Sequence, residues 1–150
     1  MRRFIFIAGL ALIAALANAQ PTATRIENKA VAKIASCIRA IEGFTDAALR
    51  YARAHGRVFT VPKNVEKDLL PHAPGAYVFV CPGSSKPYSF NNKLAGKSID
   101  SIKQKDRTIV AYEGAKGKLV FKHDGKALVG LVDGTTKMVT AKEAKALLWK

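Results

Sequence analysis

Apolar and small side chains in the first half of the chain recur at steps of three and four positions between residues 25 and 55. This spacing places them on one face of an α-helix, with most charged residues on the other faces. Thr24 and Glu27 have the spacing of a capping box at the start, and Gly56 is a stop signal at the end. The pattern predicts one long amphipathic helix that needs a sheet or a partner along its apolar face. That face consists of Ile26, Ala30, Ile34, Cys37, Ile38, Ile41, Thr45, Ala48 and Ala52.

The second half of the chain is rich in β-branched and aromatic residues, in short runs separated by glycine and proline. Runs at 76–81 and 108–113 predict strands, and a shorter strand is expected around Tyr88 and Phe90. Between residues 118 and 140, two Asp-Gly pairs separate three β-prone runs. Such pairs indicate tight hairpin turns, because both central residues of a type I′ turn need positive φ. The pairs are Asp124-Gly125 and Asp133-Gly134. We therefore expect a three-stranded β-meander.

A proline-punctuated connector over residues 57–76 joins the two halves, with one or two helical turns expected at 64–70. Thr140 and Glu143 repeat the capping-box spacing and predict a short final helix that ends at Trp149. A long helix followed by antiparallel strands belongs to the α+β class. In that class the helix packs on one face of the antiparallel sheet.

The N-terminus has the anatomy of a secretory signal peptide. A short positive segment precedes an apolar run from Phe4 to Ala17, and Ala17-Asn18-Ala19 is a small-x-small cleavage pattern. We expect a signal peptide at residues 1–19 and a mature domain at 20–150, located in the periplasm or secreted. The apolar run is shorter than the roughly 20 residues of a membrane span. The alternative is an inner-membrane anchor formed by residues 4–19.

Basic residues outnumber acidic residues by 25 to 11, a formal net charge of +14 that falls to +12 if the two N-terminal arginines are removed. A charge so far from zero attracts polyanions such as nucleic acid, lipopolysaccharide or wall polymers. The lysines are scattered along the chain, as they also are on a surface that only needs solubility. Polyanion binding is therefore the alternative function.

Two cysteines, Cys37 and Cys81, are the only ones in the chain. An even count in an exported protein favours a disulfide. The chain-entropy model gives a bridge of this loop length a stabilisation of roughly 4 kcal/mol. The alternative is a pair of buried free thiols.

No motif in the chain requires an enzyme. His55 and His72 have no neighbours at zinc-ligand spacing. A Ca²⁺ site built from Asp124, Asp133 and backbone carbonyls is conceivable, but aspartate before glycine ordinarily forms turns. A hydrolase that uses His123 and Asp133 would need a nucleophile that the sequence does not supply. We expect His123 to hydrogen-bond a backbone group or the Asp133 loop, and we expect no cofactor, metal or small-molecule substrate.

Nine residues separate His123 from Asp133-Gly134. This spacing resembles the bacterial pseudopilin-like family whose C-terminal motif is called prepilin-type processing-associated. Upstream residues follow the order of that family: Cys37, Tyr51, Pro62, Cys81-Pro82, Tyr88, Asn91-Asn92 and Glu113. The resemblance covers residues 35–140. It implies a pilin-like fold with a long N-terminal helix on an antiparallel sheet, and it implies no established activity.

The chain departs from that family at its N-terminus, where no glutamate interrupts the apolar segment and the cleavage pattern is not that of a prepilin leader. Lys122, Leu128 and Thr135 also stand where the family usually has Arg, Asn and His. These losses favour a structural role for His123 and Asp133. We expect an exported, non-enzymatic, pseudopilin-like protein that contacts envelope proteins, including type II secretion or type IV pilus-like machinery. The sequence does not specify its oligomeric state.

Overall fold

The computed structural model describes the backbone of residues 22–149 and the side chains of residues 28–149. The signal peptide or anchor expected at residues 1–19 lies outside the described residues. The chain divides into two units, one ending at Val31 and one beginning at Ala32. The described part of the first unit is helical, and the second unit contains the whole sheet.

Helix α1 (Thr22–Ala54) confirms the long helix predicted from the apolar stripe. Thr24 lies within the helix, so the expectation that it is the N-cap is wrong. Gly56 adopts φ +72°, a left-handed conformation that suits a glycine after a helix end. From Cys37 onward one face of α1 is buried, because these side chains pack on the sheet. The buried positions are Cys37, Ala40, Ile41, Phe44, Thr45, Ala47, Ala48, Leu49 and Ala52.

The sheet is antiparallel, with its strands in the order β1-β2-β3-β5-β6 and β4 paired to β3 off that path. The strands are β1 (Val80–Cys81), β2 (Lys86–Phe90), β3 (Ile109–Ala115), β4 (Lys118–Leu119), β5 (Lys126–Leu131) and β6 (Thr136–Thr140). The strands expected around Tyr88 and over 108–113 are confirmed as β2 and β3. The meander is confirmed only for β5 and β6. Its first strand instead turns back on β3, because Lys116 and Gly117 both adopt positive φ and close a tight β3–β4 hairpin.

The two Asp-Gly pairs form different turns. Asp124 and Gly125 have φ of 50° and 74°, and His123 and Lys126 exchange both backbone hydrogen bonds at 3.0 Å, as in the expected type I′ turn. The Asp133 turn is wider, because the Leu131 N–H donates to the Thr135 carbonyl and Asp133 itself accepts from the Thr135 N–H. Its aspartate therefore stabilises the loop as an Asx turn.

Short helices surround these strands. They are α2 (Val65–Leu69), α3 (Ala141–Ala144) and the 3-10 helices η1 (Leu70–His72), η2 (Ala76–Phe79), η3 (Asn92–Leu94) and η4 (Ile99–Ser101). The helical turns expected at 64–70 are confirmed. The strand expected over 76–81 is wrong for its first four residues, because η2 buries the consecutive side chains of Val78 and Phe79. The second capping box is confirmed, but α3 ends at Ala144 rather than at Trp149.

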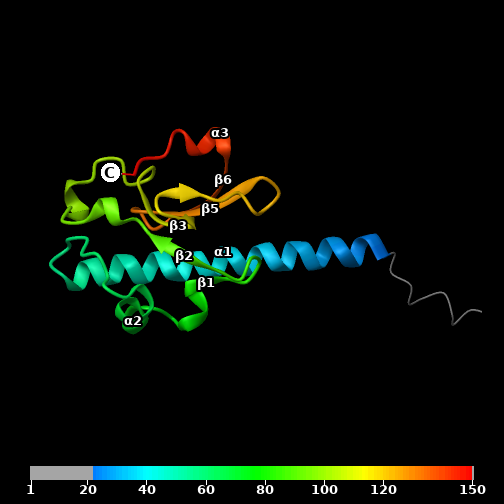
Figure 1. Cartoon of the computed structure of the whole chain (residues 1–150), viewed down its shortest axis with the longest axis horizontal. Helices are drawn as coiled ribbons and strands as arrows, with labels where there is room; N and C mark the ends of the chain where they lie inside the picture. Colours follow the sequence, from blue (N-terminus) through cyan, green and yellow to red (C-terminus); the bar gives the residue numbers. More distant parts are fainter. Residues whose placement is uncertain (1–21, 150) are drawn as a thin grey trace, which may run out of the picture. The chain divides into compact units, whose positions relative to one another are not determined.

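The sheet has buried side chains on both faces, which gives two apolar layers within the second unit. Figure 1 shows strands β3 and β5 of this unit between helix α1 and helix α3. One layer joins the sheet to α1, where Gly130 of β5 lies directly against Thr45 of α1. The other layer lies under the C-terminal segment, where Trp149 packs edge-on against Tyr112 with ring centroids 4.9 Å apart. The structure is therefore α+β, as predicted. Residues of β3 and β5 that face α1 meet the buried turns of that helix, and this arrangement positions the site described next.

Candidate functional site

Three potential metal-ligating side chains from distant parts of the chain meet between α1 and the sheet. Cys37 comes from α1, Cys81 ends β1, and His123 precedes the type I′ turn before β5. The two sulfurs lie 3.3 Å apart, and Nε2 of His123 lies 3.7 Å from the Cys81 sulfur. Both cysteines have 0% exposure and His123 has 8%. All three ligand atoms lie within 4.8 Å of one another, and no other such group of three occurs in the described part of the chain.

Glu113 in β3 completes this cluster. Its Oε1 lies 2.9 Å from Nε2 of His123, while its Oε2 accepts the backbone N–H of Leu128 in β5. The carboxylate is only 5% exposed, so it is fixed from two sides away from water. Burying a carboxylate is costly unless it is paired and hydrogen-bonded. Here both oxygens have partners, which explains how the sheet tolerates an acid at this position.

Gly83, in the turn after β1, shapes the side of the cluster nearest Cys37. Its N–H donates to the Cys37 sulfur at 3.1 Å. A Cβ atom at this position would lie 2.8 Å from that sulfur and 3.1 Å from Cε1 of His123. Only glycine therefore allows the turn to approach so closely. Tyr88 in β2 adds a further constraint, because its hydroxyl donates to the Cys37 carbonyl at 2.9 Å.

The electrostatics of the cluster do not favour a cysteine nucleophile. Burial raises the pKa of the Cys37 thiol to about 11, with hydrogen bonding and charge at Cys81 acting in the same direction. Reactive cysteines instead have lowered pKa values and some solvent access. The same nitrogen of His123 also faces both Cys81 and Glu113. A cysteine–histidine–carboxylate relay uses the two different ring nitrogens for these partners. The geometry thus gathers donor atoms without forming a nucleophile–base relay.

The expected pairing partners Cys37 and Cys81 are in contact, but they are two free thiols in this structure. Their separation of 3.3 Å exceeds the roughly 2.05 Å of a disulfide bond. The bridge stays a prediction.

The remaining predicted residues lie in turns. The expectation for His123 is wrong, because its side chain contacts the Glu113 carboxylate and the Cys81 sulfur instead of a backbone group or the Asp133 loop. Asp124 occupies the first turn position, and Asp133 caps its own loop through Thr135. The sequence reasoning gave Glu113 no role of its own. The available signal was an acid at the end of a run of buried strand residues, which is unusual unless the acid has a partner.

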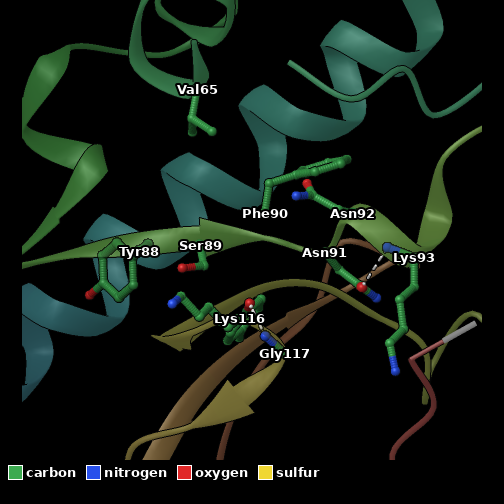
Figure 2. A pocket seen from close by; sticks show the side chains of 10 residues that line it. Val65, Tyr88, Ser89, Phe90, Asn91, Asn92, Lys93, Lys116 and Gly117 are labelled. Atoms are coloured by element: carbon green, nitrogen blue, oxygen red, sulfur yellow. Dashed lines mark hydrogen bonds between the residues drawn. The ribbon is translucent and has the colours of Figure 1, made fainter. Parts of the chain in front are cut away.

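A separate open cavity of about 370 Å³ lies beside β2 and the β3–β4 turn. Figure 2 shows its lining, in which the Asn91 side chain accepts from the Lys93 N–H and the Gly117 N–H reaches the Tyr112 hydroxyl. Its charged lining residues are Lys93 and Lys116. The charged groups in this lining are therefore both cationic.

The basic surface is largely unneutralised. Arg50 pairs with Asp46 and Arg57 pairs with Asp100, at 2.8 and 2.7 Å. Across residues 28–149, no lysine ammonium lies within 4.0 Å of a carboxylate oxygen. The lysine charges on this part of the chain are thus available to an anionic partner.

The first described turns of α1 differ from the rest of the helix. Side chains 28–33 are all exposed, and Val31 is 66% exposed although it is large and apolar. Burial begins with Ile34 and is complete at Cys37. Within the described residues, no helix is long and apolar enough to cross a bilayer.

Comparison with family models, curated proteins and solved structures found no match to this chain.

Proposed function

We propose that the chain is an exported, non-enzymatic interaction protein of pilin-like architecture that works in the bacterial envelope. Its partner is a helix of an envelope or secretion-system protein, which packs against the first described turns of α1. The observation that carries this proposal is the run of exposed side chains at 28–33, on a helix whose later turns are buried in the core.

The physical argument concerns what stabilises those turns. Most helical stability in proteins comes from packing of an apolar face, because isolated short helical segments are marginal in water. Ala30, Val31 and Ile34 supply apolar surface, but the first two are exposed and the third is only partly buried. A second helix packed on this segment would bury the Val31 side chain, worth about 1.5–3 kcal/mol. When a helix packs in a groove or on another helix, its apolar anchor residues are three or four positions apart, as Val31 and Ala30 are from Ile34.

The test is site-specific photo-crosslinking in the native host, with the crosslinking residue placed at position 31. The matched control places it at Tyr77, which is 62% exposed in the folded unit and is also large and apolar. We expect a product at position 31, absent at position 77, whose partner is identified by mass spectrometry as an envelope protein. Equal labelling at both positions, or no product at position 31, would contradict the docking role.

Export is tested separately by the mass of the mature chain. An N-terminus at Gln20 is the expected result. A chain that retains Met1 or begins at Phe4 would contradict the cleaved form and favour the anchored form.

Polyanion binding is the second candidate function, and the unneutralised lysines are the observation that favours it. Binding that relies on lysine contacts to phosphates releases counterions, so its affinity falls steeply with salt. We expect measurable binding to duplex DNA or to anionic vesicles at low salt that disappears as salt is raised. Neutral vesicles are the control. Failure to bind either anionic surface at low salt would remove this candidate.

A further inference from the structure

The sulfurs of Cys37 and Cys81 and the Nε2 nitrogen of His123 lie within 4.8 Å of one another at one buried point, and the Glu113 carboxylate adjoins them through His123. Consecutive donor atoms are separated by 3.3, 3.7 and 2.9 Å. Sulfur, imidazole and carboxylate are the three protein ligand types of Zn²⁺. The described contacts therefore link four potential ligands from four different segments of the fold.

The spacing matches what a tetrahedral zinc ion requires. With Zn–S bonds of about 2.3 Å and Zn–N bonds of about 2.0–2.1 Å, tetrahedral angles separate two sulfurs by roughly 3.8 Å and a sulfur from a nitrogen by roughly 3.6 Å. The observed sulfur–sulfur and sulfur–nitrogen distances are 3.3 and 3.7 Å. Both observed distances lie within about 0.5 Å of the tetrahedral values.

A Cys37–Cys81 disulfide would explain fewer of these contacts than a bound metal ion does. It would use the two sulfurs and leave an ionisable histidine and a buried carboxylate beside them with no role in the bond. A divalent cation uses all four groups, and it offsets the cost of holding the Glu113 carboxylate away from water. The Gly83 N–H that points at the Cys37 sulfur also matches a metal thiolate, because such outer hydrogen bonds orient and stabilise ligands.

We propose that Cys37, Cys81 and His123 bind one structural Zn²⁺ ion, with Glu113 as the fourth ligand. In the metal-free form the Nε2 nitrogen of His123 and the Glu113 carboxylate are hydrogen-bonded to each other. On binding, Nε2 gives up the proton of that hydrogen bond, to solvent or by a tautomeric shift to Nδ1, and its lone pair then binds the ion beside the carboxylate oxygen. The two thiols lose their protons, so the affinity rises with pH. The ion then joins α1 to β1, to β3 and to the turn before β5.

The ligand set also favours zinc over harder cations. Ca²⁺ and Mg²⁺ take six or more oxygen ligands, whereas this cluster has two sulfurs and a nitrogen. A closed tetrahedral site with four protein ligands is typical of structural zinc rather than of a catalytic ion with an open position. The inference is independent of the interaction role proposed above, because the cluster is buried and does not include residues 28–33.

The primary experiment uses the unaltered full chain, reduced and freed of metal. It is titrated with Zn²⁺ alone in competition with a chromophoric chelator, and metal content is measured by mass spectrometry after desalting. We expect one tightly bound ion per chain. We also expect Co²⁺ to give sulfur-to-cobalt charge-transfer bands and the visible spectrum of a tetrahedral ion.

Variants then assign the ligands. Cys81→Ser and His123→Gln should each weaken zinc binding at least about 100-fold, and Glu113→Gln should weaken it about 10–100-fold. The matched control is His55→Gln, because His55 is exposed and lies outside the cluster. This control should bind zinc as the unaltered chain does. The far-ultraviolet circular dichroism spectrum of each variant shows whether that variant folds. If a variant does not fold, the zinc titration of the unaltered chain decides the proposal.

Three outcomes would overturn the proposal. One is a reduced chain that folds and takes up no zinc. A second is a chain isolated from its host with Cys37 and Cys81 bridged, which takes up no zinc after reduction. Zinc binding that persists in both Cys81→Ser and His123→Gln would also overturn the assignment, because the ion would then lie elsewhere.

Discussion

The contact between Gly130 and Thr45 can be tested directly, because it determines how closely α1 approaches the sheet. Replacing Gly130 with alanine adds a Cβ atom that collides with the Thr45 hydroxyl. The same atom would lie 2.9 Å from Thr45 Cβ and 3.0 Å from its Cγ2. Thr45 has little freedom to move away, because its hydroxyl donates to the Ile41 carbonyl at 2.6 Å and its side chain is fully buried.

The expected cost follows from two opposing effects. Inserting a methyl group into a well-packed core typically costs about 1–3 kcal/mol. Alanine in a strand regains about 0.5–1 kcal/mol relative to glycine, because the unfolded chain loses freedom. We therefore expect Gly130→Ala to lower the free energy of unfolding by about 1–2 kcal/mol. Thr45→Ala removes the hydroxyl, which lies nearest the new methyl, and Cγ2, and it keeps only the Cβ contact, so the double variant should recover about 1 kcal/mol relative to additivity.

The assay is urea unfolding of the four members of this cycle, followed by circular dichroism. Gly96→Ala is the control, because Gly96 has φ +74° and no atoms within 4 Å of its added Cβ. It should destabilise through backbone strain and show no coupling to Thr45→Ala. If the Gly130 and Thr45 effects add within about 0.5 kcal/mol, the close approach of α1 to β5 is not what requires glycine.

Three further outcomes are expected. Thr140→Ala removes the α3 cap and should cost about 0.5–2 kcal/mol in urea unfolding, whereas Thr140→Ser should cost little. Asp124→Val should destabilise the chain more than Asp124→Asn in thermal melts, because a β-branched residue does not adopt φ 50° without strain. The pKa values of Asp100 and Glu143 are lowered, by the Arg57 guanidinium and by the Thr140 backbone N–H respectively. Their stabilisation is therefore present above the ordinary carboxyl pKa and lost as pH falls through the lowered values. NMR titration should find both pKa values below the ordinary values of 3.8 and 4.5, and Arg57→Gln should raise only the pKa of Asp100.

Sequence rules that consider only neighbouring residues predicted the elements whose signal lies within a few positions. The α1 stripe, the Asp124 turn and the Thr140 capping box each depend on residues within a few positions of one another. The rules failed where tertiary contacts decide. Residues 76–79 have strand propensity but form η2, because the core accepts two consecutive side chains there. Lys118–Leu119 turns back on β3 because of a Lys-Gly turn that has a weak sequence signal.

The cluster around His123 was only partly predictable for the same reason. Cys37 and Cys81 are 44 residues apart, and Cys81 and His123 are 42 apart, so no short ligand motif exists. The cysteine count indicated that the two sulfurs would meet. Nothing in the spacing indicated that Glu113 and His123 would join them, because their meeting depends on the register of β3 and on the turn before β5.

Helix α1 lies far along the sequence from the strands that it packs against, and this sequence separation affects the folding rate. The Tyr88 hydroxyl bonds a carbonyl 51 residues away in α1, and the contacts at Cys37 span similar distances. Helices form in microseconds or less, whereas contacts of such separation must first close long loops. In a newly made chain this segment therefore forms helical turns, marginally stable without packing, long before a surface exists to cover Phe44 and Ile41. We expect the docking of β3 and β5 on α1 to limit the folding rate. Until they dock, the apolar face of α1 is exposed, and we expect this segment to be the one that aggregates or binds a chaperone.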